Sequence, residues 1–202
     1  MSKDPYFISQ YVGIKNTKIL KNAKLIFSTQ QDSEVLPFLK EVYKKVGLNY
    51  PKYHKMDPLC KLGILATSVL LKDSDFSNET ALVFSNASSS LNTDLRHQQS
   101  IENIVSPAIF VYTLPNIVLG EVSIKFGLQS ENAFFIEEDF NPKLIYEYTE
   151  LLLNSKKAPS VVCGWIELKN AEYDVFLCFI SKQGEIPFTT ENLKKLYLFE
   201  NE

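Results

Sequence analysis

From residue 57 onward, continuous apolar runs of strand length alternate with segments whose apolar residues recur at helical spacing. The run Ala81 to Phe84 has no polar break, which is typical of a strand covered on both faces. The helix before it is marked by Asp57 as a cap, Pro58 at the first helical position and an apolar stripe that ends near Leu71. This alternation predicts an α/β layered domain with a mostly parallel, mixed sheet flanked by helices.

The same signals predict further elements along the chain. Helices are expected over 32–46 (capped by Asp32 or Ser33 and ended by Gly47), 115–126 (ended by Gly127), 141–153 and, as a short segment that docks or frays, 190–199. Strands are expected over 6–12 and 23–27, both near a sheet edge, and over 133–136, 161–166 and 173–180. The polar stretch 85–100, rich in serine and asparagine, is expected to be a long surface loop.

Length and charge limit the class of protein. The chain has 202 residues, of which 45% are hydrophobic, and this fits one globular domain with a core over about 1–183 and a C-terminal extension over 184–202. A net charge of −3 with scattered lysines predicts no nucleic-acid partner. No apolar run of signal or transmembrane length occurs, so we expect no membrane association and a cytoplasmic location.

The three cysteines, Cys60, Cys163 and Cys178, are odd in number and are not spaced as a pair, so they are expected to be reduced thiols without a disulfide or a metal. Cys163 and Cys178 lie in apolar runs and are interpreted as small core residues. Cys60 follows Asp57 and Pro58 in the first turn of a helix. It is either structural or a thiol whose pKa the helix terminus lowers.

Other chemistry-bearing residues have no partner at a catalytic spacing. His54 and His97 are interpreted as solvated loop residues, although His97 could touch a ligand. Trp165, Phe110 and Tyr112 have apolar surroundings and are expected in the core rather than in a stacking platform. No residue pattern predicts a cofactor or a metal site.

Four segments in order resemble the ketosynthase branch of thiolase-like enzymes. They are Met56-Asp57-Pro58, Ala81 to Ser85, Leu114-Pro115-Asn116 with Val122-Ser123-Ile124, and Val161 to Glu167. The runs 106–116 and 126–129 are similar to the segment that precedes the nucleophile in that family, and the loop 86–98 is similar to proteins of aryl polyene and flexirubin-type pathways. The resemblance implies a layered thiolase-like half-domain, equivalent to the N-terminal half of a β-ketoacyl-acyl carrier protein synthase.

The resemblance also indicates which catalytic residues of the family this chain lacks. In the family, a strand leads from the glycine that Gly127 matches to a cysteine at the start of the next helix, and counting along this chain brings that position to Asp139. No cysteine lies between 61 and 162, and the family's two histidines belong to a C-terminal half that this chain does not reach. Acyl transfer onto a ketosynthase needs a thiolate, so we expect no catalytic residue for condensation.

Two roles are open for the acidic residues near that position. Glu137, Glu138 and Asp139 either form a carboxylate acid/base pair or complement the positive end of the next helix, and the second role is the more ordinary one. In family dimers, the strand before the nucleophile pairs across a two-fold axis. The resemblance therefore predicts an interface at Asn132, Ala133, Phe134, Phe135 and Ile136. The helix 142–153 is expected to need a cover, because a half-domain lacks the second sheet.

The first hypothesis is a non-catalytic accessory or chain-length-factor-like subunit in fatty acid, polyene or polyketide biosynthesis. Its partners would be a second copy or a full-length ketosynthase, and possibly an acyl carrier protein. The alternative is an acyl-chain or small-molecule binding module that uses a cleft beside Pro115, Asn116 and Asp139. The third is an enzyme of altered activity, such as a decarboxylase with Asp139 or Glu138 as base.

Overall fold

In this computed structural model, residues 5–29, 35–102 and 105–199 are described, and their strands form one mixed sheet. The strand order is β3-β2-β1-β7-β6-β4-β5, and β8 pairs with β1. The strands are β1 (Phe7–Lys15), β2 (Lys18–Lys21), β3 (Lys24–Ser28), β4 (Ala81–Asn86), β5 (Asn132–Ile136), β6 (Val161–Lys169), β7 (Glu172–Ser181) and β8 (Ile186–Pro187).

The parallel part of the sheet is its β5-β4-β6 end. Strand β4 pairs in parallel with β5 on one side and β6 on the other, and the remaining pairs are antiparallel. All six residues of β4 are buried, as its unbroken apolar run predicts. The sequence-based prediction of an α/β layered fold with a mixed sheet is confirmed. The expectation that the sheet is mostly parallel is wrong, because five of its seven strand pairs are antiparallel.

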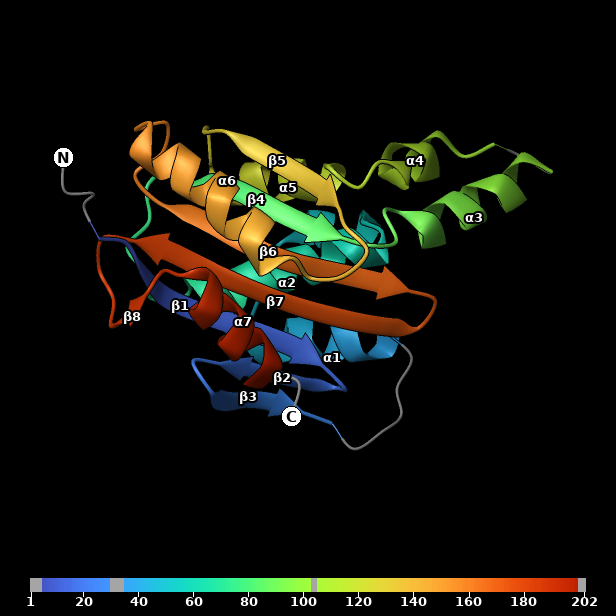
Figure 1. Cartoon of the computed structure of the whole chain (residues 1–202). Coiled ribbons are helices and arrows are strands. Elements are labelled where there is room, and N and C mark those ends of the chain that lie inside the picture. Colours follow the sequence, from blue (N-terminus) through green and yellow to red (C-terminus); the bar gives the residue numbers. More distant parts are fainter. Residues whose placement is uncertain (1–4, 30–34, 103–104, 200–202) are drawn as a thin grey trace.

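Helices cover both faces of the sheet (Figure 1). On one face lie α1 (Val35–Val46), α2 (Pro58–Leu71) and α5 (Ile117–Phe126), and on the other lie α6 (Pro142–Asn154) and α7 (Thr190–Phe199). Along β4, Leu82 and Phe84 pack into the first layer, whereas Ala81 and Val83 pack into the second. Because successive side chains of β4 point to opposite faces of the sheet, this one strand contributes residues to the cores on both faces.

The predicted helix boundaries hold where a cap or a glycine marks them. The Asp57 carboxylate accepts a hydrogen bond from the Cys60 backbone N–H (3.0 Å), and the Asn141 side chain accepts one from the Leu144 N–H (3.1 Å). Gly127 ends α5 in the left-handed region with φ of 68°. The expected caps of the first helix, Asp32 and Ser33, lie outside the described residues.

The expectation of a long loop over 85–100 is wrong. This stretch continues β4 to Asn86 and then forms α3 (Leu91–Ile101), which is followed by α4 (Pro107–Phe110) and the 3₁₀ turn η2 (Val111–Thr113). We call residues 91–102 and 105–114 the arm, because α3 and α4 extend away from the sheet (Figure 1). Thr93 is the one buried residue of α3, so the helix has no apolar stripe facing a core that sequence periodicity could detect.

Two other expectations are corrected by the topology. The first strand does not lie near an edge, since β1 is inserted between β7 and β2, and the short strand β2 was not predicted. The expectation that α6 needs a cover from outside the chain is also corrected, because α7 and the segment before it pack against α6. Leu193 of α7 is fully buried, and the rings of Phe188 and Tyr146 lie 5.0 Å apart.

Candidate functional site

The parallel strands end together at a surface hollow of about 770 Å³. Ala87 and Ser88 follow β4, Glu138 and Asp139 follow β5, and Lys169 ends β6. Ligands in open α/β sheets bind outside the carboxyl ends of the strands. This hollow, called here the carboxyl-end hollow, is therefore the candidate site.

Side chains from five separate segments line the carboxyl-end hollow. They comprise the rings of Phe140, Trp165, Tyr173 and Tyr197, the carboxylates of Glu138, Asp139, Glu167, Glu172 and Asp174, and the amines of Lys15 and Lys169. Sequence reasoning found only Glu138 and Asp139. Phe140 follows Asp139 in the β5–α6 turn, and the other named side chains come from the β1–β2 turn, the β6–β7 hairpin and α7, which no local motif connects.

Hydrogen bonds fix several of the polar side chains. The Glu167 carboxylate accepts from the backbone N–H groups of Ala87 (2.6 Å) and Ser88 (3.0 Å). Asp174 accepts from the Tyr197 hydroxyl (2.6 Å), and its Oδ2 lies 3.5 Å from the Lys15 Nζ. Because carboxylates outnumber amines in this lining, the hollow carries negative charge.

Asp139, which the resemblance places at the nucleophile position, is exposed in the turn between β5 and α6. Its neighbour Glu137 accepts a hydrogen bond from the Asn141 amide (2.8 Å), and Asn141 in turn caps α6. Carboxylates at this place stabilise the following helix, because they lie near its positive N-terminal end. The described lining of the hollow contains no thiol and no imidazole, so Asp139 has no neighbour that could form a nucleophile and base pair with it.

The structure separates the other predicted binding residues from Asp139. Pro115 and Asn116 stand at the start of α5, and neither lines the carboxyl-end hollow. The structure therefore does not form the cleft that was expected beside Pro115, Asn116 and Asp139. Of the residues predicted for the site, only Glu138 and Asp139 line the hollow.

The predicted interface strand β5 is the terminal strand of the sheet. It pairs with β4 along one side, and none of the described strands pairs with its other side. Ala133, Phe134 and Phe135 are half-buried, and Ile136 is 52% exposed. An unpaired edge of this kind offers a row of backbone N–H and C=O groups to another strand.

The arm exposes apolar side chains beside its polar attachments. Of the 14 exposed large hydrophobic residues among the described ones, seven belong to it: Leu91, Leu95, Ile101, Val105, Phe110, Val111 and Leu114. Its base is held by polar contacts. The Thr93 hydroxyl donates to the Asp57 carboxylate (2.9 Å), and the Tyr112 hydroxyl donates to the buried Glu121 (3.0 Å). The expectation of a core position for Phe110 is wrong, since its side chain is 61% exposed.

Cys163 and Cys178 are buried, as expected, and Cys60 is buried as well. Burial and the nearby Asp57 raise the pKa of the Cys60 thiol well above its ordinary value, so the alternative of an activated Cys60 is wrong. Burial also raises the pKa of Cys163 to about 12. Trp165 is buried, as predicted, at 4% exposure.

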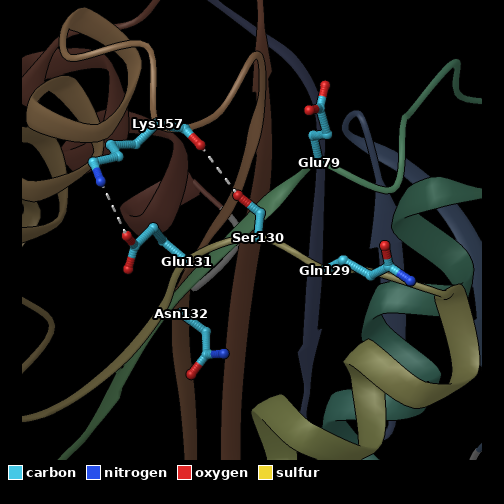
Figure 2. Close-up of a pocket in the computed structure, with 6 residues that line it drawn as sticks. All are labelled: Glu79, Gln129, Ser130, Glu131, Asn132 and Lys157. Carbon is cyan, nitrogen blue, oxygen red and sulfur yellow. Dashed lines mark hydrogen bonds and ion pairs between the residues drawn. The ribbon is translucent and has the colours of Figure 1, made fainter.

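A second hollow of about 490 Å³ lies at the amino ends of the strands, and Figure 2 shows its lining residues. These are Glu79, Gln129, Ser130, Glu131, Asn132 and Lys157. Lys157 Nζ lies 3.8 Å from Glu131, and the Ser130 hydroxyl donates to the Lys157 carbonyl (3.3 Å). This hollow is polar and borders the first residue of β5.

Among the described residues, no group of three or more His, Cys, Asp or Glu side chains could hold a metal ion. No single helix there is long and apolar enough to cross a membrane. One bent pair, 107–113 with 117–126, meets the criterion by length and composition only.

The fold and the hollow together define an α/β layered protein whose strand ends form a hollow beside an open sheet edge. Comparison with known proteins makes this class more specific. No protein-family model matches the sequence, and no curated protein matches it. Solved ketosynthase and chain-length-factor structures, however, share its fold.

Three of these structures illustrate the likeness. "The ishigamide ketosynthase/chain length factor" has a TM-score of 0.62 at 15% identity, covering 91% of this chain and 64% of that chain. "Ketosynthase (ApeO) in Complex with its Chain Length Factor (ApeC) from Xenorhabdus doucetiae" has a TM-score of 0.61 at 13% identity, and the match covers 99% of this chain and 93% of that chain. A "type II PKS acyl-carrier protein in complex with its ketosynthase" (AntDE:AntF) has a TM-score of 0.59 at 12% identity, and the match covers 89% of this chain and 63% of that chain.

The shares of the chains that are covered differ between these structures. This chain spans less than two thirds of the chains matched in the first and third structures, but almost the whole of the one matched in the second. The resemblance to the ketosynthase branch, inferred from sequence segments, is thereby confirmed for the fold.

Proposed function

We propose that this protein is a non-catalytic, chain-length-factor-like subunit that pairs with a full-length ketosynthase in polyketide, polyene or fatty acid biosynthesis. The observation that carries the proposal is the open edge of β5, which leads into the turn that contains Asp139, the residue that the resemblance places at the nucleophile position. A ketosynthase-like chain without a thiolate at that position keeps the surface for pairing and lacks the group for acyl transfer.

The arm supports a protein partner. A concentration of exposed apolar side chains marks a contact surface, and isolated ones do not. Half of the exposed large hydrophobic residues of the described chain lie within the 22 described residues of the arm. The polar contacts at its base, from Thr93 and Tyr112 to buried carboxylates, hold this surface in place before a partner binds.

The names of the similar structures suggest the partner. One contains a ketosynthase with its chain length factor and another contains an acyl carrier protein with a ketosynthase. We place a ketosynthase on the β5 edge and include an acyl carrier protein and a homodimer as further partners. The proposal includes a cytoplasmic location, where thiols such as those of the three cysteines stay reduced.

The test is light scattering of the purified chain with a full-length ketosynthase encoded nearby. A 1:1 complex is expected. It should be lost in Ile136→Asp, because a charge on the exposed end of β5 would be desolvated in the interface. Leu25→Asp is the matched control, since Leu25 is 57% exposed on β3, the opposite edge of the sheet. Equal loss in both variants, or no complex with the unaltered chain, refutes the proposal.

The carboxyl-end hollow favours a second candidate, a small-molecule binding module. Four aromatic rings and a volume of about 770 Å³ are suited to an organic ligand. A rise in melting temperature with acyl-pantetheine that disappears in Trp165→Ala would favour it. The third candidate, a decarboxylase, requires carbon dioxide release from malonyl carrier protein that Asp139→Asn abolishes.

A further inference from the structure

The carboxyl-end hollow contains more negative charge than the amines in its lining neutralise. Of the two lysines there, Lys15 lies 3.5 Å from Asp174, and Lys169 stands opposite Glu172 in the register of the β6–β7 hairpin. The three carboxylates that remain are those of Glu138, Asp139 and Glu167. None of them forms an ion pair with a described residue. The lining therefore has a net demand for positive charge.

One oxygen of the Glu167 carboxylate is buried and has no hydrogen-bond donor. Its Oε2 accepts from the backbone N–H groups of Ala87 and Ser88, whereas no described residue donates to its buried Oε1. A buried acceptor without a donor costs free energy that a bound donor recovers. Because Glu167 lines the hollow, a ligand held there is placed to supply this donor.

Aromatic rings connect Glu167 with the two carboxylates of the β5–α6 turn. Phe140 directly follows those two carboxylates, and its ring lies 6.4 Å from the ring of Trp165. Trp165 and Glu167 are two residues apart on β6, so their side chains lie on the same face of the sheet. The Phe140 ring also lies 4.5 Å from that of Tyr197. The two acidic groups are therefore joined by apolar, aromatic surface.

This arrangement fits an organic cation better than a metal ion. The carboxylates are not gathered closely enough for a metal, since no described group of three or more His, Cys, Asp or Glu side chains could hold one. Aromatic rings attract organic ammonium groups and cover methylene groups. Separated carboxylates with aromatic surface between them fit a chain that has an ammonium group at each end.

We propose that the carboxyl-end hollow binds an alkyl diamine in its doubly protonated form. One ammonium group donates to the Glu167 Oε1, and the carboxylates of the β5–α6 turn hold the other. The methylene chain lies along the rings of Phe140 and Trp165. This inference rests on the second candidate function, the binding of a small molecule in the hollow, and it does not depend on pairing at β5.

The experiment follows the fluorescence of Trp165, the only tryptophan of the chain, while 1,5-diaminopentane is added to the full chain. Because this residue lines the hollow, a ligand there should change its emission. The neutral analogue 1,5-pentanediol should bind at least about tenfold more weakly, because its hydrogen bonds to the carboxylates lack the positive charge. Added salt should weaken the binding of the diamine but not of the diol.

Variants test the carboxylates separately. Glu167→Gln keeps the size of the side chain but removes its charge, and it should weaken diamine binding at least about tenfold. Glu138→Gln with Asp139→Asn removes two exposed charges and should also weaken it about tenfold. Glu79→Gln with Glu131→Gln removes the same charge from the second hollow (Figure 2), and this matched control should retain binding.

Several outcomes overturn the inference. These are no change in emission or melting temperature with the diamine, an equal loss in the control variant, and equally tight binding of the diol or of magnesium ions. If Glu167→Gln does not fold, as judged by circular dichroism, the variant of the two exposed carboxylates decides. Acyl-pantetheine is titrated in the same assay. Binding of acyl-pantetheine without binding of the diamine would refute this inference alone, whereas binding of neither would refute the second candidate as well.

Discussion

The body of the molecule, meaning the described residues outside the arm, buries most of its large apolar side chains, whereas the arm exposes them. In the body, Phe38, Phe84 and Phe176 are all less than 2% exposed, but Phe110 of the arm is 61% exposed. The body is held together by two apolar cores, and the base of the arm is held by hydrogen bonds to Asp57 and Glu121. The difference indicates that the body supplies stability and the arm supplies contact surface.

The largest effect is expected in the body. Phe84→Ala on β4 removes a fully buried ring from the core between the sheet and the helices α1, α2 and α5, and it should lower the free energy of unfolding by about 3–5 kcal/mol. Urea unfolding followed by circular dichroism measures the loss. A cost below about 1 kcal/mol would show that the core around β4 is not the stabilising element.

The next effect tests whether α7 belongs to the body. Leu193→Ala removes a fully buried side chain, and it should cost about 2–3 kcal/mol in the same urea assay. The exposed neighbour Lys194 gives the control Lys194→Ala, which should stay within about 0.5 kcal/mol. Equal values for the two variants would mean that α7 is only loosely docked.

A smaller effect is expected at the base of the arm. Thr93→Val keeps the side-chain shape but removes the donor to the buried Asp57, so we expect a loss of about 1–2 kcal/mol. Proteolysis should then cut within 91–114 sooner than in the unaltered chain. An unchanged cleavage rate would show that this hydrogen bond does not position the arm.

The buried thiols predict a modest dependence on pH. Burial raises the pKa of Cys163 to about 12 in the folded chain, so the folded state disfavours the thiolate. The stabilisation is present below the unfolded pKa and is lost as the pH rises toward 12. Between pH 7 and 9.5 the contribution of Cys163 to the free energy of unfolding should fall by about 1 kcal/mol. Cys163→Ala should flatten this profile, and an identical slope in the variant would contradict the assignment.

The smallest effect on stability is expected at the tip of the arm. Phe110→Ser should change the free energy of unfolding by less than about 0.5 kcal/mol, because the ring is mostly exposed. The same change should weaken the complex with the ketosynthase, measured by light scattering. A stable complex with this variant would remove the arm from the interface.

The sequence predicted best what local physics determines. The cap at Asp57, the cap at Asn141 and the left-handed Gly127 set helix ends that the structure confirms. The arm was missed because a helix that buries only Thr93 has no apolar stripe. The carboxyl-end hollow could be predicted only at Glu138 and Asp139. Its other walls, such as Lys15, Glu167 and Tyr197, meet through strand order, which local patterns do not encode.

The position of β1 also has a consequence for the kinetics of folding. Phe7 pairs with Ser181 and Ile14 pairs with Val175, so the first strand finds its central neighbour only near the end of the chain. Loop-closure entropy makes contacts of such sequence separation slow to form. During synthesis, β1 therefore lacks this neighbour until β7 has left the ribosome, and the sheet can be completed only after that point.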